Sequence, residues 1–206
     1  MFARATLILC LLLFTAQAHA GPEIQTWETD NGARVMFVEA PAIPMLDVRV
    51  VFNAGSARDG KLPGLALMTN MLLNDGAADL TADQLAEGFE SLGAQFGTSS
   101  LRDMAILTLR TLSEDEVRQQ SLALLGKVLK SPTFPADEIE RRRLQMRVGL
   151  EKQAESPSAT AKNHFFEALF NDHPYAHNPA GDEKSIEAMT RDDILAFYNR
   201  YYVAAN

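Results

Sequence analysis

The stretch GLALMTNMLLNDG, residues 64–76, decides the fold of this chain. Apolar residues dominate it from Gly64 to Asn74, which predicts a helix that is buried in the core. Asp75-Gly76 ends that helix, since a glycine after the last turn is a common stop signal. A strand over residues 45–54 and a polar loop over residues 55–63 are predicted before it. The helix is therefore expected to follow a strand and to pack on a sheet.

Two further strands are predicted around Asn31-Gly32, over residues 23–30 and 33–39, because Asn-Gly is a strong hairpin signal. Residues 34–38 are almost continuously apolar, which is typical of a strand that is covered on both faces. Residues 94–100 and 104–112 also read as strands. The second of these alternates between apolar and polar residues, as a half-buried strand does.

Helices are predicted between and after the strands. Thr81 with Gln84 forms a capping box for one helix, and Ser113 with Glu116 is expected to form another for the helix that follows. Later helices are predicted over residues 137–155, 158–171, 185–189 and 190–202. This order favours an α+β fold, with a mixed and largely antiparallel sheet and helices packed on it.

Residues 1–20 are expected to be a cleaved signal peptide, so that the mature chain begins near Gly21. Arg4 supplies a basic start, residues 6–15 form an apolar run too short to span a bilayer, and Ala18-His19-Ala20 is an A-x-A cleavage site. Cys10 lies in the middle of the apolar run, which disfavours a lipoprotein. We therefore expect a periplasmic or secreted protein, with no membrane span after removal of the signal.

The composition is that of a folded globular protein and disfavours some functions. The 206 residues are 47% hydrophobic and 22% charged, which suits one sizeable domain over residues 21–206. A formal charge of −8 without a basic run disfavours nucleic acid as a partner. Cys10 is the single cysteine, so the mature chain can form neither a disulfide nor a thiolate metal site.

Short motifs, none of them specific alone, carry a resemblance over residues 24–206. They are Asn31-Gly32, Asn53-Ala54-Gly55-Ser56, Gly64-Leu65-Ala66, Gly76, Leu92-Gly93-Ala94, His173-Pro174-Tyr175, Ser185-Ile186, Thr190-Arg191-Asp192-Asp193 and Phe197-Tyr198. In this order and spacing the chain resembles the N-terminal half of the insulinase, pitrilysin and mitochondrial processing peptidase family. The resemblance implies a metallopeptidase-type domain, expected to continue beyond residue 206 into a last strand and a second homologous half.

In that family the helix that begins Gly-Leu-Ala carries an inverted zinc motif, H-x-x-E-H. Two imidazoles four residues apart share the metal, and the Glu takes a proton from the metal-bound water, whose pKa zinc lowers to about 7. The three motif positions are here Leu67, Asn70 and Met71. The third ligand of the family, a Glu on a later helix, corresponds to Glu151.

One carboxylate cannot hold catalytic zinc. The sequence therefore assigns no catalytic residue, no cofactor and no firm metal ligand to this chain, and Glu151 stands as a relic of the metal site. Leu67 and Met71, four residues apart on the helix, are expected to be ordinary core residues.

Three other features favour structural over functional interpretations. The Asn-Ala pair that the family keeps near the substrate corresponds to Gly97-Thr98, a second departure on the same wall of the cleft. His164, His173 and His177 lack helical metal spacing, because prolines interrupt the segment. Arg141 to Arg143 have acidic neighbours and are interpreted as a solvated, salt-bridged helix face.

The resemblance, with its departures, implies an exported homologue that is the non-catalytic subunit or scaffold of a heteromeric zinc metallopeptidase. Zinc is then expected in a homologous partner subunit, and the substrate is a peptide or protein. Two alternatives remain open. One is an active metalloendopeptidase with a rearranged site built from Glu151 and the histidines. The other is a peptide-binding or assembly protein without a peptidase partner, which holds an extended peptide at a sheet edge.

Overall fold

The structure is a computed structural model that describes residues 21–206. The predicted signal peptide, residues 1–20, lies outside the described residues. The described residues divide into two units, one that ends at Ala42 and one over Ile43–Asn206. Within residues 21–206, no helix combines the length and the apolar character that crossing a membrane requires.

The first unit contains an antiparallel hairpin of β1 (Ile24–Glu28) and β2 (Arg34–Val38). The predicted turn is confirmed, and Gly32 takes a φ of 87°, a conformation that glycine adopts without strain. The prediction that β2 is covered on both faces is wrong, because residues 36–38 are exposed. An apolar run shows only that a strand is suited to burial. Burial also requires other elements that pack against its faces, and a two-stranded hairpin does not supply them.

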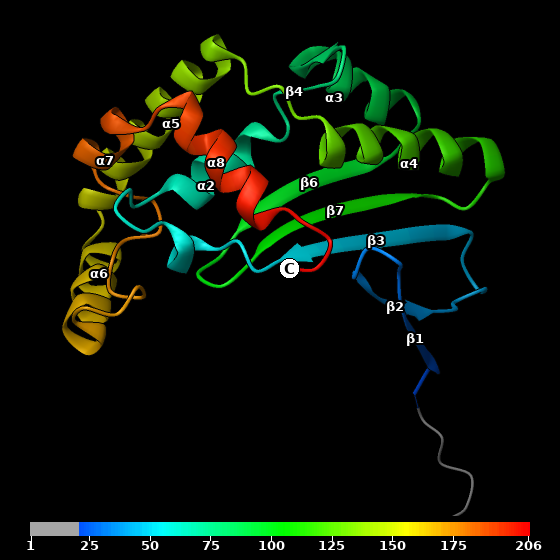
Figure 1. The fold of residues 1–206 in the computed structure, drawn as a ribbon, viewed down its shortest axis with the longest axis horizontal. Coiled ribbons are helices and arrows are strands. Elements are labelled where there is room, and N and C mark those ends of the chain that lie inside the picture. The colour runs from blue at the N-terminus through cyan, green and yellow to red at the C-terminus, as the bar shows by residue number, and fades with distance from the viewer. Residues whose placement is uncertain (1–20) are drawn as a thin grey trace, which may run out of the picture. The chain divides into compact units, whose positions relative to one another are not determined.

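The second unit is built on a three-stranded antiparallel sheet in the order β3-β7-β6 (Figure 1). Its strands are β3 (Met45–Phe52), β6 (Gln95–Ser100) and β7 (Ala105–Leu112). Along β7, residues 107, 109 and 111 are buried, whereas residues 108, 110 and 112 are exposed. The predicted alternation is confirmed, and it assigns one face of the sheet to the core.

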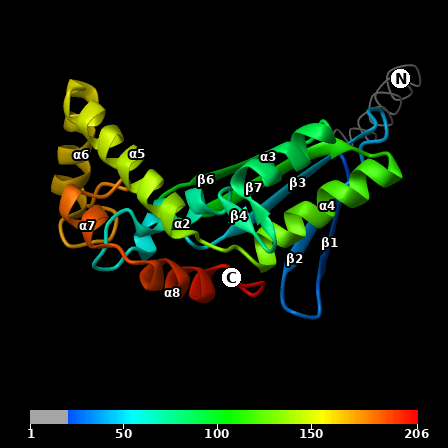
Figure 2. The ribbon, with the colours of Figure 1, turned by 90° about the horizontal axis from the view of Figure 1, so that it is seen from above.

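The helices of this unit follow the predicted order, and α3 and α4 run along the sheet (Figure 2). Of the helices, α4 contacts β7, while α2 contacts β6, α5 and α8. The α+β prediction is thereby confirmed. The remaining elements are η2 (Ser56–Arg58), α2 (Leu65–Leu72), β4 (Gly76–Ala77), β5 (Leu80–Thr81), α3 (Ala82–Ser91), α4 (Asp115–Lys130), α5 (Ala136–Ala154), α6 (Pro157–Phe170), α7 (Glu183–Ala188) and α8 (Arg191–Tyr201).

One of the two predicted capping boxes is present. Thr81 accepts the N–H of Gln84, whose side chain accepts the N–H of Thr81. The box predicted at Ser113 is wrong, since α4 begins only at Asp115 and has no side-chain cap. Ser113 instead donates its N–H to the carbonyl of Pro44 at 3.0 Å, a contact between distant segments that no local pattern shows.

The core of this unit is centred on α2, as the sequence predicts. Met68 and Leu72 are fully buried, together with Leu107 from β7 and Ile194 from α8. Burying side chains of this size stabilises the fold by about 1.5–3 kcal/mol each. The helix that the resemblance singles out for chemistry is therefore also the helix on which the packing depends.

Candidate functional site

A buried carboxylate fixes the start of α2. The side chain of Asp59 accepts hydrogen bonds from the backbone N–H groups of Gly64 at 2.8 Å and Ala66 at 2.7 Å. A helix leaves its first N–H groups without partners, and negative charge is favourable there. Gly64 has a φ of 93°, and a Cβ at this position would meet the backbone of Ala180 and Gly181 at 3.1 Å. Only glycine allows the start of α2 and the loop before α7 to lie this close together.

The three motif positions lie on α2 with their side chains in or against the core. Leu67 and Met71 are half-buried and pack against the core cluster. Asn70 is 1% exposed, and its Nδ2 donates a long hydrogen bond of 3.4 Å to the hydroxyl of Tyr202. Burial raises the pKa of Tyr202, so the phenol is neutral at ordinary pH. These side chains offer neither an imidazole nor a base.

Glu151 lies on α5 and is exposed. The α5 side chains that belong to the core or pack against it are instead Ile139, Met146 and Leu150. Within residues 21–206, no three His, Cys, Asp or Glu side chains are grouped so that they could hold a metal ion. A catalytic zinc site needs three protein ligands, and the residues at and around the motif positions do not fit one.

Gly97 and Thr98 lie on β6, which forms one edge of the three-stranded sheet. The Oγ1 of Thr98 accepts a hydrogen bond of 2.9 Å from Nδ2 of Asn74. Asn74 also donates to the carbonyl of Met71 at 3.1 Å. The Thr98 hydroxyl therefore takes part in a structural contact that ties the end of α2 to β6.

The structure does not bring the three histidines together. His164 is exposed on α6. His173 lies edge-on to Tyr175, whose backbone N–H it accepts at 3.2 Å. The Nε2 of His177 lies 3.0 Å from Oδ2 of Asp59, so this imidazole connects the loop before α7 to the start of α2.

The interpretation of Arg141 to Arg143 as a solvated, salt-bridged face is confirmed only in part. Arg141 pairs with Glu138 and Arg143 with Glu140, but the face is not solvated throughout. Arg142 is 18% exposed and donates to both carboxylate oxygens of Asp75, at 2.5 Å and 2.7 Å, while Asp75 itself is 2% exposed. Arg141 adds a contact of 2.8 Å to the same carboxylate. Arg143 donates to two backbone carbonyls at the end of α7. The partner carboxylate lies 67 residues before Arg142, so helical spacing alone could not indicate it.

Sequence reasoning missed three residues that organise this region, namely Asp59, Asp75 and Arg102. Asp59 precedes a glycine in a polar loop and so has the sequence context of a turn residue. Asp75 was interpreted as part of a helix stop. Arg102 lies in the turn between β6 and β7, yet its guanidinium reaches the loop before α7. The contacts of Asp75 and Arg102, and that of Asp59 with His177, join segments that are distant in the sequence, so no local pattern indicates them.

The sequence profile described as "Insulinase (Peptidase family M16)" matches residues 34–183. Among solved structures, the "peptidase M16 inactive domain" from Pseudomonas fluorescens is similar, with a TM-score of 0.88 and 44% sequence identity. That match covers 89% of this chain and 45% of the other chain.

The curated relatives include proteins named as zinc proteases and one named as a non-peptidase homologue. An "Uncharacterized zinc protease" of Rickettsia bellii is 24% identical over 177 residues, which are 85% of this chain and 42% of that protein. The "Non-peptidase homolog YmxG" of Helicobacter pylori is 27% identical over 161 residues, which are 78% of this chain and 37% of that protein. The chain thus spans less than half the length of these relatives.

Proposed function

Since this chain belongs to the insulinase family, peptidase family M16, we propose that it is an exported, non-catalytic member of the family. In this proposal it has lost the ligands of the H-x-x-E-H motif and serves as a subunit or scaffold beside a homologous, zinc-bearing peptidase. The observation that carries the proposal is the chemistry of α2, where Leu67, Asn70 and Met71 lie at the positions that the resemblance assigns to the motif.

None of these three side chains can do what the motif does. Leucine has no donor atom, and the thioether of methionine is a soft ligand that suits copper better than zinc. An amide such as that of Asn70 accepts no proton at neutral pH, and this one already faces the hydroxyl of Tyr202. The proposal therefore requires the metal and the base to come from another subunit.

The similarity to an inactive domain and to a non-peptidase homologue supports the same reading. Export is supported by the signal-like residues 1–20. A subunit of this kind supplies a binding surface and no catalytic groups. Its role is to hold a peptide or protein substrate in position, or to help enclose it, while a partner with an intact motif cleaves it.

The test is co-expression of the full-length chain with a homologous exported chain that carries H-x-x-E-H, followed by purification through a tag on one of them. We expect the two to co-purify and to cleave a fluorogenic peptide together, whereas this chain alone does not. Replacing the Glu of the partner's motif by Gln should abolish cleavage, and Glu151→Gln in this chain should not. Chelator-sensitive cleavage by the isolated chain would overturn the proposal, and failure to form a complex would overturn its heteromeric part.

A further inference from the structure

A groove of about 470 Å³ opens beside Leu67, within the size range of ligand pockets. Elements distant in sequence contribute to it: α2, the end of β6 with its turn, α5, α6 and the loop before α7. Although the chain carries a formal charge of −8, no acidic residue lines this groove. The lining residues are Leu67, Ser100, Leu101, Arg102, Gln153, Ala159, Lys162, Asn163, Phe166, Asn178, Pro179 and Ala180.

Arg102 supplies a cation that is held in place. Its Nη1 donates to the carbonyls of Tyr175 at 2.7 Å and His177 at 3.1 Å, and its guanidinium lies 4.0 Å over the ring of Phe166. The hydrogen bonds that it makes within residues 21–206 use Nη1 alone, while a guanidinium has five N–H donors. The Nε and Nη2 donors therefore remain for a planar anion. Burial lowers the pKa of Arg102, and the nearby Tyr175 and Asp103 act against this lowering.

Lys162 provides a second cation at the rim of the groove. It is exposed on α6 and takes part in none of the ion pairs found within residues 21–206. Three amides, from Gln153, Asn163 and Asn178, add donors and acceptors to the lining. The amides of Asn178 and Gln153 orient each other through a hydrogen bond of 2.6 Å.

We propose that this groove binds the C-terminal end of a peptide, with its carboxylate on Arg102 and Lys162 and an apolar last side chain against Leu67 and Phe166. The two cations without an acidic lining residue match a carboxylate, and the amides match the polar groups of a peptide backbone. Binding needs no metal and no partner subunit, so it can be tested on this chain alone, separately from the heteromeric part of the proposed function.

The test is fluorescence anisotropy with the purified mature chain and a short, N-terminally labelled peptide that ends in Phe. The same peptide with a C-terminal amide is the first control, and an amidated peptide with an internal Glu is the second. We expect the free acid to bind roughly tenfold more tightly than either amide, and added salt to weaken its binding. The small acid 3-phenylpropionate, added as a competitor, should displace the peptide only weakly.

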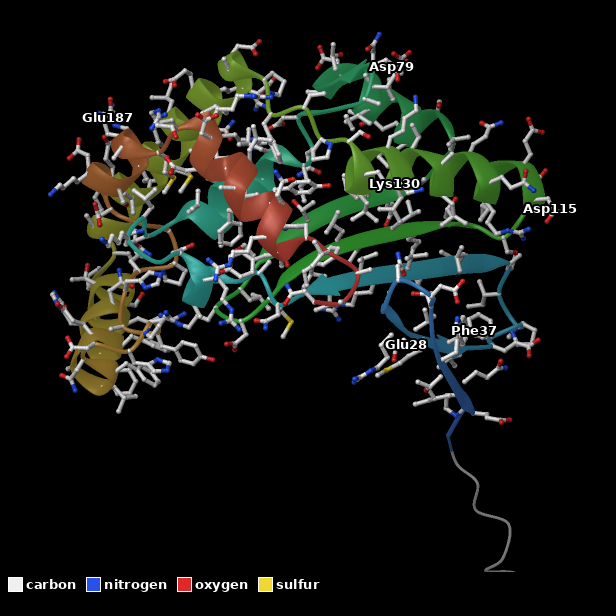
Figure 3. All side chains as sticks on the ribbon, viewed as in Figure 1. Glu28, Phe37, Asp79, Asp115, Lys130 and Glu187 are labelled. Atoms are coloured by element: carbon white, nitrogen blue, oxygen red, sulfur yellow. The ribbon has the colours of Figure 1, made fainter. Side chains whose placement is uncertain are left out.

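The decisive variant is Lys162→Glu, because the exposed position leaves the fold intact, whereas replacing Arg102 would also remove its contacts to the loop before α7. We expect roughly five- to tenfold weaker binding of the free acid and unchanged binding of the amide. Lys130→Glu is the matched control, since Lys130 lies on α4, away from α6 (Figure 3). It should leave both affinities unchanged, with circular dichroism showing that both variants are folded.

Several results would overturn the proposal. Absence of binding, equal affinity for acid and amide, or an equal loss in the Lys130→Glu control would each do so. Equal binding of the amidated peptide with an internal Glu would assign the groove to acidic side chains instead of chain ends. Competition by 3-phenylpropionate at the peptide's own affinity would assign it to small carboxylic acids.

Discussion

The side-chain nitrogen of Asn70 lies 3.4 Å from the phenolic oxygen of Tyr202, which is 132 residues away in the sequence. Both residues belong to the core, with 1% and 8% exposure. Asn70, which the resemblance aligns with the catalytic base of the family's motif, is a neutral amide that faces a neutral partner. In this chain Asn70 is a structural residue.

Replacing Asn70 by Glu is expected to destabilise the protein by about 2 kcal/mol or more, because it buries a carboxylate without a cation. A buried carboxyl has a folded-state pKa above its unfolded value of about 4.3, so the loss should grow as the pH rises above that value. Urea denaturation at about pH 4 and about pH 8 tests this dependence. Gln145→Glu, at an exposed position beside Arg142, is the matched control and should change little. Equal stability of N70E at both pH values would contradict the burial of this position.

Asp75→Asn is expected to cost about 3 kcal/mol, because it leaves Arg141 and Arg142 facing a neutral group where the structure has a buried carboxylate. The free energy of unfolding from urea titrations measures the effect. Asp79→Asn removes an exposed carboxylate (Figure 3), which forms an ion pair with Lys127, and it should have little effect. Similar losses of stability in both variants would mean that the ion pairs of Asp75 with Arg141 and Arg142 do not stabilise the fold more than an exposed pair does.

Asp59→Ala removes the acceptor of two N–H groups at the start of α2 and of the His177 contact. We expect a loss of about 2–3 kcal/mol, since both N–H groups are then buried without partners. His177→Ala should cost less, because it leaves the helix start capped. Thermal denaturation of the two variants compares them. A larger loss in H177A than in D59A would show that the imidazole, and not the helix cap, holds this region together.

The buried tyrosine predicts sensitivity to alkaline pH. Burial raises the pKa of Tyr202, so above the unfolded-state value of about 10 the unfolded chain releases a proton that the folded chain keeps. Stability should therefore fall as the pH rises from about 10. Tyr202→Phe is expected to make this fall shallower, and urea titrations over that pH range measure it. An unchanged slope would assign the alkaline sensitivity to other groups, such as the half-buried Tyr198, whose pKa burial also raises.

The sequence predicted those parts of the fold that depend on local patterns. Neighbouring residues set the alternation of β7, the capping box at Thr81 and the buried helix predicted over residues 64–74. The structure confirms all three, with the helix at Leu65–Leu72. The errors concern groups whose partners are distant in the sequence. The backbone of Ser113 contacts Pro44. The arginines at positions 141–143 form hydrogen bonds with Asp75 and with carbonyls at the end of α7. The spacing of apolar residues indicates which face of a helix or strand is buried. It does not indicate which distant carboxylate an arginine or lysine side chain contacts.

The candidate site shows the same division. A motif comparison aligned Leu67, Asn70 and Met71 with the metal motif, and this assignment stays a prediction. It could not show that Asn70 meets Tyr202, or that Leu67 borders a groove that contains Arg102 and no acid. These relationships arise only when the turn after β6, α6 and the loop before α7 come together around α2.

The most direct test of the central claim is the zinc content of the purified, mature, full-length protein. We predict no stoichiometric zinc in the isolated chain, and about one zinc ion per complex once a homologous partner with an intact motif is bound. The metal should then be unaffected by Glu151→Gln and lost when a motif imidazole of the partner is replaced. Tightly held zinc in the isolated chain, lost on Glu151→Gln, would contradict the claim and show that this chain has a metal site of its own.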